Sequence, residues 1–428
     1  MQGGDTRARW AWVEPAVWTD RMLAALENGV KGGKWFSLID KVWSEKVLTA
    51  AWARVNANAG SQGVDGMTVH RFGQRLDEEI RRLSEQVRDG SYRPLAVRRK
   101  WIPKPGSKEQ RPLGVPAVRD RVVQTALRLV IEPIFDRLFA EHSYGFRPGR
   151  GCKHALQEVD RLLKAGYVWV VDADLKSYFD TIPKNPLMQR LEEQIADGRL
   201  LALLRLYLDA EVMDGLQHWT PEAGTPQGAV ISPLLANVYL NPLDHTMAQR
   251  GFRMVRYADD FVILCRTRDE AESALALVRQ WTEAAGLTLH PTKTRIVPEA
   301  EGFDFLGYHF RGGKHWPRKK SLTKHKDTLR LLTRRCNGRS LEELIRRANA
   351  ITRGWYGYFK HSYTTTFPSL DGWLRHRLRT ILLKRSGKSR WRSTHDDHRR
   401  WPNAFFQAHG LFSLAAAHAA ECRSRQPW

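Results

Sequence analysis

The hydrophobic and polar positions of the chain follow two periodicities, which together predict a mixture of helices and strands. Apolar residues recur at helical spacing over 18–26, 38–55, 69–88, 118–139, 152–164, 186–212, 232–244 and 269–285. Mostly apolar stretches predict strands at 167–174 and 252–265, a strand and turn at 287–294, and a strand pair at 303–310. Because helices separate these strands along the chain, the middle of the protein is predicted to be an α+β sheet domain.

A basic segment at 92–115 precedes this predicted sheet domain. Its short apolar pieces are separated by prolines and by basic residues, namely Arg98, Arg99, Lys100, Lys104, Lys108 and Arg111. The pattern predicts strand, turn and strand, a ribbon whose basic face could hold a triphosphate. A hairpin that contacts only backbone phosphates is the alternative interpretation.

After the sheet domain the pattern becomes helical again, and three helices are predicted from about Leu322. The second begins at Ser340, where Glu343 three residues later gives the sequence of a capping box. The third carries its apolar residues between 370 and 382. This pattern predicts a separate helical domain, followed over 391–428 by a tail with a polar start and an Ala-rich end.

The composition narrows the class of partner. The chain has 428 residues, enough for two or three domains, with a formal net charge of +23 and a pI of about 10.1. So basic a chain is expected to bind a polyanion, and nucleic acid is favoured over an anionic membrane. No apolar run reaches the ~18 residues of a spanning helix, and the N-terminus lacks the apolar core of a signal peptide. The four cysteines lie far apart, so a cytoplasmic protein with free thiols is expected, nucleoid-associated when it acts on DNA.

The positive charge is concentrated towards the C-terminus. Residues 314–400 hold 24 Lys and Arg against 6 Asp and Glu, a net charge of +18. Aromatic residues interleave with these charges, among them Trp316, Trp355, Tyr358, Trp373 and Trp391. Basic and aromatic side chains together suit phosphates and stacked bases. We therefore predict a nucleic-acid contact here, in preference to a merely solvated charged face.

Two adjacent carboxylates, Asp259 and Asp260, lie between short apolar arms at 254–255 and 261–265. The arms predict a β-hairpin with both aspartates at its bend. Negative charge gathered at one point is costly without a cation, and hard divalent ions such as Mg²⁺ prefer oxygen ligands. Taken alone, these residues fit a solvated surface turn equally well.

A second carboxylate motif favours the functional interpretation. The apolar strand at 167–174 ends in Asp172 and Asp174, which lie on the same face of the strand. A buried strand that ends in carboxylates is a poor structural choice and a good functional one. Asp174, Asp259 and Asp260 at one sheet edge would fit two-metal phosphoryl transfer, in which one ion activates a 3′-hydroxyl and both stabilise developing charge.

In the order of its motifs the chain resembles the reverse transcriptase–maturases encoded by bacterial group II introns, over roughly residues 35–390. Residues 257–260 look like the family's catalytic hairpin and 174–180 like its first-metal motif. Residues 224–228 resemble its template- and nucleotide-contacting motif, and 303–308 its primer grip.

This resemblance implies a right-hand polymerase with a basic all-helical thumb. The domains it implies are an N-terminal helical extension over 1–60, fingers over 61–165, a palm over 166–315, a thumb or maturase domain over 316–390, and a tail over 391–428. The implied function is RNA-directed DNA polymerisation, with intron RNA binding that assists splicing and supports intron mobility. Intron RNA as template, a DNA primer or target, and dNTPs are the implied partners.

The resemblance also assigns residues to functions. It implies that Asp174, Asp259 and Asp260 are catalytic and, with Leu175, form the site of two Mg²⁺ ions, with Mn²⁺ as the alternative ion. Asp172 lies outside that assignment, and a salt bridge is expected for it. Nucleotide contacts are implied for Lys104, Arg111, Phe179, Gln227 and Lys293. Phe179 stands where the family has the gate against a 2′-hydroxyl, and Lys293 where it has a pyrophosphate-side lysine. Primer, template or RNA contacts are implied for Arg147, Gly307, Arg346, Arg347, Arg353, Trp355 and Tyr358.

The tail departs from many members of this family. Their C-terminal nuclease needs closely spaced Cys and His ligands, whereas 391–428 offers Cys422 and scattered histidines. The chain is therefore expected to belong to the subclass without that nuclease. Its tail could still contact DNA through Arg390, Arg392, Arg399 and Arg400, with Trp391 or Trp401 stacking on bases.

Three other functions stay open on the sequence. A reverse transcriptase of the same fold could serve phage defence, CRISPR adaptation or repair. A non-enzymatic splicing factor would be expected to have lost its active-site carboxylates, yet all three are present. An RNA-dependent RNA polymerase would have to tolerate a 2′-hydroxyl, and the bulk of Phe179 argues against it.

Overall fold

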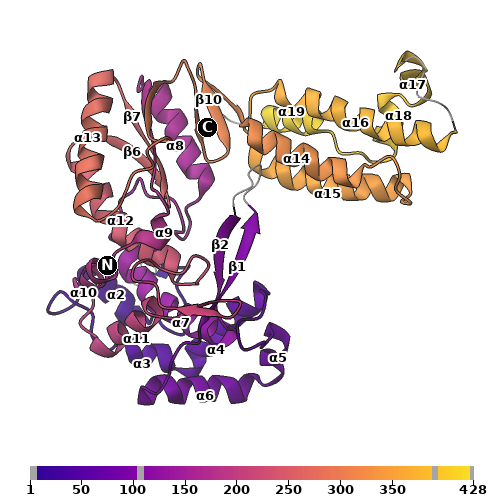
Figure 1. Cartoon of the computed structure of the whole chain (residues 1–428). Coiled ribbons are helices and arrows are strands. Elements are labelled where there is room, and N and C mark those ends of the chain that lie inside the picture. Colours follow the sequence, from indigo (N-terminus) through magenta and orange to yellow (C-terminus); the bar gives the residue numbers. More distant parts are fainter. Residues whose placement is uncertain (1–6, 104–109, 388–393, 425–428) are drawn as a thin grey trace. The chain divides into compact units, whose positions relative to one another are not determined.

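The computed structural model describes residues 7–103, 110–387 and 394–424, which form two compact units divided between Val297 and Pro298 (Figure 1). No helix among these residues is long and apolar enough to cross a membrane. The finer domain boundaries expected from the sequence stay predictions.

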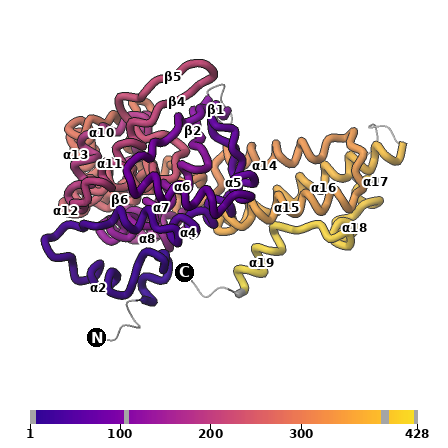
Figure 2. The backbone as a smooth tube through the Cα atoms, turned by 90° about the horizontal axis from the view of Figure 1, so that it is seen from below, coloured from indigo at the N-terminus to yellow at the C-terminus, as the bar shows by residue number. Residues whose placement is uncertain are grey.

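The N-terminal part of the first unit is helical, as the periodicity predicts. Its helices are α2 (Asp20–Asn28), α3 (Ile39–Trp43), α4 (Glu45–Ala57), α5 (Val69–Gln74), α6 (Leu76–Asp89) and α7 (Val118–Asp136). The predicted helices at 38–55 and 69–88 are each divided, because Ser44 and Arg75 leave the helical conformation. Helices α4 and α7 pack side by side (Figure 2). The buried Trp18 side chain donates a hydrogen bond from Nε1 to the Leu129 carbonyl of α7 at 3.0 Å.

The central sheet of the first unit has the strand order β6–β7–β3–β8. Its strands are β3 (Trp169–Asp174), β6 (Arg253–Tyr257), β7 (Asp260–Cys265) and β8 (Arg295–Pro298). Strands β3 and β6 both run antiparallel to β7. The sheet packs against α8 (Cys152–Lys164), α12 (Ser232–Gln249) and α13 (Arg268–Ala284) (Figure 1). The predicted strand at 287–289 is wrong apart from an isolated bridge between Leu289 and Leu175.

A second sheet, in the order β2–β1–β4–β5, was only half expected. The predicted basic hairpin is confirmed as β1 (Val97–Pro103) and β2 (Gln110–Val115). The other strands are β4 (Val212–Asp214) and β5 (Gln217–Trp219), in a segment to which the sequence pattern assigns no strand. The predicted helix at 186–212 is instead α10 (Lys184–Glu192) and α11 (Gly198–Leu208). The carboxylate of Asp197 explains the break, because it caps α11 and also accepts hydrogen bonds from the backbone of Leu38 and Ile39.

The second unit joins a small sheet to a helical bundle. Strands β9 (Phe303–Phe305), β10 (Tyr308–Arg311) and β11 (Lys314–Pro317) are antiparallel. The three predicted helices are confirmed as α14 (Lys319–Leu332), α15 (Leu341–Phe359) and α16 (Thr366–Arg385). Ser340 caps α15 by accepting a hydrogen bond from the Glu343 backbone at 3.1 Å. Tyr308 and Tyr358 bind the sheet to α15, each donating its hydroxyl to a backbone carbonyl.

The tail packs as part of this bundle. Its helices are α17 (Thr394–Arg400), α18 (Asn403–Ala408) and α19 (Leu414–Ser424). Asp371 of α16 accepts hydrogen bonds from the backbone of Leu414 and Ala415, so a carboxylate on the bundle caps α19. Trp401 and Phe406 lie in the apolar core of the bundle. Burial of Trp401 contradicts its predicted stacking on DNA, whereas Trp391, Arg390 and Arg392 lie outside the described residues.

Candidate active site

The predicted hairpin with two aspartates at its bend is present as β6, a two-residue loop and β7. Tyr257 and Asp260 pair across the strands, so the loop is Ala258 and Asp259. Ala258 has a φ of +60°, the left-handed conformation that tight hairpin loops require. Gly145 comes so close to this loop that a Cβ built on it would lie 2.3 Å from the Ala258 nitrogen. Two segments distant in the sequence therefore shape the turn together.

Asp174 and Asp260 are direct cross-strand partners at the ends of β3 and β7. Residues paired in this way point to the same face of an antiparallel sheet. Asp259 lies in the adjoining turn, where burial raises the pKa of its carboxyl and the charge of Asp174 raises it further. Arg111 is near enough for its charge to lower the pKa of Asp259. The structure thus brings the three predicted carboxylates to one edge of the sheet, with a fingers arginine beside them.

Basic residues near β8 pair with the carboxylates of β3. The Lys293 Nζ atom lies 2.5 Å from the Oδ2 atom of Asp174. The Arg295 Nε atom lies 3.2 Å from Asp172 Oδ2, which confirms the salt bridge expected for Asp172. Leu175, the other residue assigned to the metal site, is buried and follows Asp174 directly.

A fully buried arginine, which the sequence analysis did not single out, holds the hairpin in place. Arg256 bonds with both carboxylate oxygens of Asp244, through Nε at 2.7 Å and Nη2 at 2.5 Å. Its Nη1 atom donates to the Ala258 carbonyl at 2.9 Å and to the Asn237 side chain at 2.9 Å. Its Nη2 atom also donates to Ser143 Oγ at 2.8 Å. The Arg256 side chain therefore joins the Ala258–Asp259 turn to α12 and to the 142–145 segment.

The predicted nucleotide residues Phe179 and Gln227 meet at the loop before α12. Phe179 lies in α9 (Tyr178–Thr181), half-buried, and its carbonyl accepts a hydrogen bond from the Thr225 backbone at 2.7 Å. The Gln227 carbonyl accepts one from Gly114 of β2 at 2.6 Å. Gly224 has a φ of +92°, and a Cβ there would lie 2.7 Å from the Phe179 carbonyl. Lys104, the other basic nucleotide candidate of the hairpin, lies outside the described residues.

Arg147, a predicted template or RNA contact, bonds within its own unit. Its Nε atom lies 2.7 Å from Asp136 Oδ1, and its other nitrogens donate to the carbonyls of Asp136, Ala140 and Ser143. The side chain is only 5% exposed. These bonds shape the loop before Gly149, and the template or RNA contact of Arg147 stays a prediction.

The predicted RNA residues of the second unit lie on or beside α15, with different exposure. Arg346 and Arg347 are exposed, and both pair with Glu343, at 2.7 Å and 2.5 Å. One half of the capping box is therefore formed, the bond from the Glu343 backbone to Ser340. The Glu343 side chain pairs with the two arginines. Arg353 is exposed, with its guanidinium 4.3 Å from the centre of the Phe412 ring.

The aromatic and glycine candidates of this unit are less exposed. Trp355 stacks on His325, with ring centres 4.6 Å apart, and burial lowers the pKa of His325 to about 4. Tyr358 donates its hydroxyl to the Leu306 carbonyl at 2.7 Å. Gly307 follows with a φ of +83° and accepts a backbone hydrogen bond from Arg318 at 2.9 Å. Tyr358 and Gly307 thus have structural contacts at the 305–308 turn.

The donor set at the sheet edge suits a divalent cation in its chemistry. Carboxylate oxygens are the preferred ligands of Mg²⁺, and the raised pKa of Asp259 reflects its burial and then the charge of Asp174, both of which a bound cation would offset. Within residues 7–103, 110–387 and 394–424, no three His, Cys, Asp or Glu side chains already have the arrangement of a metal site. Asp174 is held by the ammonium group of Lys293 instead, so metal binding would require the two to separate.

The comparisons with known proteins define the class first. Residues 102–310 match the reverse transcriptase (RNA-dependent DNA polymerase) family, and residues 322–401 match the maturase-specific domain of group II introns. Protein YkfC of Escherichia coli strain K12 is 32% identical over 341 residues, which cover 70% of this chain and 85% of that protein. These matches define an RNA-directed DNA polymerase with a maturase domain, a class that binds RNA and DNA and uses divalent metal ions.

The family follows from the same matches. This chain belongs to the group II intron-encoded reverse transcriptases and maturases. The group II intron-encoded protein LtrA of Lactococcus lactis subsp. cremoris is 37% identical over 201 residues, 47% of this chain and only 33% of LtrA. Among solved structures, a partial Cas6-RT-Cas1–Cas2 complex aligns with 58% of this chain and 41% of that chain, at 25% identity and a TM-score of 0.38. Reverse transcription combined with a role in splicing is the function that the two matched domains support.

Proposed function

We propose that this protein extends a DNA primer on an RNA template, with Asp174, Asp259 and Asp260 as the catalytic carboxylates. The observation that carries this assignment is the cross-strand pairing of Asp174 with Asp260, with Asp259 in the adjoining turn of a reverse transcriptase domain. Two Mg²⁺ ions held by these residues and Leu175, or Mn²⁺ in their place, would lower the pKa of the primer 3′-hydroxyl and stabilise charge on the reacting phosphate.

The neighbouring residues bind and orient the incoming nucleotide in this proposal. Arg111 lies beside Asp259 and would hold the triphosphate from the β1–β2 hairpin, together with Lys104. Lys293 would leave Asp174 and pair with the pyrophosphate side of the nucleotide. In each case a basic side chain would give up a hydrogen bond to the protein or to water and form one with the anionic nucleotide.

Phe179 and Gln227 would set the choice of nucleotide. Phe179 lies five residues after Asp174 of β3. Its backbone carbonyl accepts a hydrogen bond from Thr225, in the loop that carries Gln227. We propose that the ring packs under a deoxyribose and collides with a 2′-hydroxyl. Gln227 would contact the nucleotide or its template base from the opposite segment.

Arg256 would act as a positioning residue for this chemistry. Arg256 contacts no reacting group, but its bond to the Ala258 carbonyl fixes the turn that carries Asp259. Since Asp244 neutralises its charge in the core, the arginine can hold the turn without leaving a buried charge unpaired.

The second unit would bind intron RNA, assist splicing and support mobility of the intron. This proposal rests on the maturase match over 322–401 and on exposed basic residues of α15, including Arg346, Arg347 and Arg353. In domain terms we propose fingers over 61–165, a palm over 166–315 and a maturase domain over 316–390.

The direct test is extension of a labelled DNA primer on an RNA template with purified protein and Mg²⁺. We expect extension with dNTPs and little with NTPs, because Phe179 excludes the 2′-hydroxyl. A second arm omits Mg²⁺ or supplies Ca²⁺ in its place. Preference for NTPs, or extension that needs no divalent ion, would contradict the proposal.

A further inference from the structure

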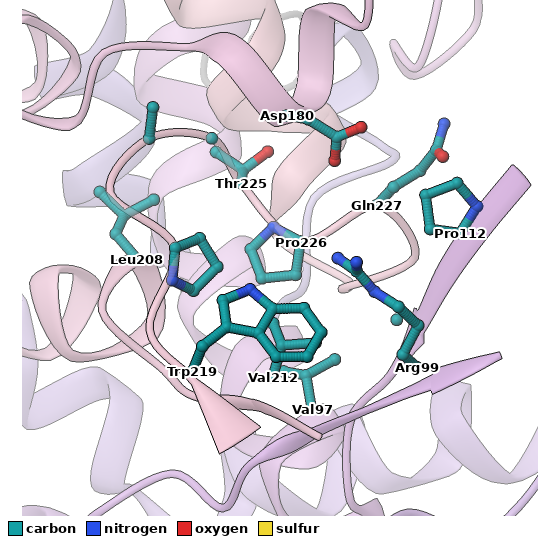
Figure 3. Close-up of a pocket in the computed structure, with 14 residues that line it drawn as sticks. Val97, Arg99, Pro112, Asp180, Leu208, Val212, Trp219, Thr225, Pro226 and Gln227 are labelled. Carbon is teal, nitrogen blue, oxygen red and sulfur yellow. The ribbon is translucent and has the colours of Figure 1, made fainter. Parts of the chain in front are cut away.

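A pocket of about 290 Å³ lies beside the 224–227 loop of the first unit (Figure 3). Its walls come from β1 and β2, from the β4–β5 hairpin, from α9 and from the loop itself. Three side chains line it that have no part in the polymerase chemistry proposed above, namely Arg99, Asp180 and Trp219. The pocket therefore needs an explanation of its own.

One wall of the pocket offers a stacking surface. The Arg99 guanidinium lies 4.7 Å from the centre of the Trp219 ring. In the view of Figure 3 it projects from β1 between Trp219 and Asp180. Nucleobases stack on the flat, polarisable faces of aromatic rings, so the Trp219 indole is the stacking surface of this wall, and the Arg99 guanidinium beside it is a hydrogen-bond donor. This wall suits a flat heterocycle better than an aliphatic ligand.

The opposite wall offers hydrogen-bonding groups. Asp180 presents a carboxylate whose pKa is raised by partial burial and lowered by the charge of Arg99. Thr225 is 2% exposed, and its Oγ1 atom has no hydrogen-bond partner among the described residues. Buried hydroxyl groups normally have partners, because an unpaired one loses its bonds to water without replacement. Thr225 therefore leaves a hydrogen-bonding group unsatisfied at the edge of this wall.

The polar groups discriminate among the bases. A carboxylate can accept two hydrogen bonds from the N1 and N2 donors of guanine, while an arginine donates to its O6 and N7 acceptors. Adenine lacks the O6 acceptor and the N1 donor, and the pyrimidines lack an N7 edge. Asp180 and Arg99 together therefore complement guanine better than any other base.

We propose that this pocket binds an unpaired guanine of the template strand, in the nucleotide ahead of the one being copied. Only an unpaired base has its Watson–Crick edge available for Asp180. The pocket shares Gln227 with the proposed nucleotide site, so it lies where a template strand would approach that site. Assignment of the strand as template rests on the proposed polymerase function, whereas recognition of the base does not.

The test uses the full-length protein and a labelled DNA primer annealed to RNA templates with a two-nucleotide 5′ overhang. The outer overhang base is guanine, inosine, adenine or an abasic site, and affinity is measured by fluorescence anisotropy without dNTPs. We expect the guanine overhang to bind about tenfold more tightly than the abasic one, with inosine between them because it lacks the N2 donor. Equal affinity for all four overhangs would overturn the proposal.

Variants locate the effect in the pocket. Asp180→Asn should reduce affinity for the guanine overhang to the level of the adenine overhang and leave the abasic affinity unchanged, which also shows that the variant folds. Trp219→Leu should weaken binding of every base relative to the abasic site. Asp214→Asn is the matched control, because Asp214 lies on β4 outside the pocket and accepts a bond from Trp101 at 2.8 Å. Guanine preference retained by Asp180→Asn, or lost by Asp214→Asn, would overturn the assignment.

Two further experiments are needed. The first distinguishes a template base from a free nucleotide as the ligand, and the second distinguishes failure of the pocket proposal from failure of the polymerase proposal. Guanosine monophosphate in millimolar excess should not remove the guanine preference; if it does, the pocket binds a free nucleotide and the template assignment is wrong. The same duplexes are then extended with dNTPs. Guanine preference without extension would support the pocket and contradict the polymerase proposal, and extension without preference would do the reverse.

Discussion

The Lys293 ammonium group lies 2.5 Å from the carboxylate of Asp174, at the end of the strand that carries the first proposed catalytic residue. The lysine side chain is 60% exposed, so it can move away when a cation or a nucleotide arrives. In our proposal this pair separates, so that Asp174 binds metal and Lys293 binds phosphate.

Lys293→Ala is expected to raise KM for dNTPs about tenfold while kcat falls less. The lysine contributes a charge to nucleotide binding but does not touch the reacting hydroxyl in our proposal. Steady-state primer extension over a range of dNTP concentrations measures both constants. Lys293→Arg is the control and should retain most of the affinity. A variant that loses kcat with unchanged KM would place Lys293 in the chemical step instead.

Phe179→Val is expected to increase use of NTPs relative to dNTPs by at least ~10-fold. A smaller side chain removes the collision with the 2′-hydroxyl, and dNTP use should fall less than NTP use rises. Single-nucleotide incorporation with matched dNTP and NTP pairs measures the ratio. Tyr178→Phe is a control on the same short helix, since Tyr178 is buried and bonds to the Ala236 carbonyl. If the ratio of NTP to dNTP use is unchanged in Phe179→Val, Phe179 is an ordinary core aromatic residue.

Arg256→Met is expected to destabilise the first unit by about 3–5 kcal/mol, because it leaves the buried carboxylate of Asp244 unpaired. The double variant Arg256→Met with Asp244→Leu should recover part of that stability but little activity, since the bond to the Ala258 carbonyl is still missing. Denaturant unfolding measures the first effect and primer extension the second. Full activity in the stable double variant would show that Arg256 serves folding alone.

Asp120 should make stability depend on pH. Burial raises its pKa from the ordinary 3.8 to about 6, against the hydrogen bond that Tyr92 donates at 2.5 Å. The folded state then holds a proton that the unfolded state releases, so this contribution is complete below pH ~4 and is lost as pH rises through about 6. The loss amounts to about 3 kcal/mol.

Urea unfolding of wild type and Asp120→Asn at pH 5 and pH 7.5 measures this effect. The variant cannot ionise at this position, so its stability should decrease less between the two pH values. Asp214→Asn, at a half-buried position of β4, serves as the control. If all three proteins change equally, the pH dependence arises elsewhere.

Arg346 and Arg347 should contribute modestly to RNA binding, since both pair with Glu343. We expect Arg346→Gln with Arg347→Gln to reduce the slope of log K against log[salt] by up to about 1.4, or ~0.7 for each phosphate contact on single strands. Arg81→Gln with Arg82→Gln, two exposed arginines on α6, is the matched control and should change little. Equal slopes for both double variants would remove α15 from the RNA surface.

Local features of this site could be predicted from the sequence, and long-range ones could not. The hairpin at 254–265 follows from apolar arms on either side of Asp259 and Asp260, a signal contained in a dozen residues. The β4–β5 hairpin was missed because its strands have three residues each and are defined by pairing with β1.

Residues with distant partners account for the other errors. A signal for Arg256 existed, because a charged residue within an apolar strand needs a buried partner, but nothing local identifies Asp244 as that partner. The bond of Arg147 to Asp136 was not predicted, because it depends on how α7 ends. Trp401 was expected to be free because its neighbours are polar, whereas the bundle buries it.

The central claim is that the aspartates of the β6–β7 turn catalyse DNA synthesis. Primer extension with dNTPs on an RNA template by Asp259→Asn tests it most directly, with Asp269→Asn, an exposed aspartate at the start of α13, as the matched control. We expect at least ~10³-fold slower incorporation by Asp259→Asn, with RNA affinity and unfolding midpoint close to those of wild type. Wild-type extension rates from a folded Asp259→Asn protein would contradict it.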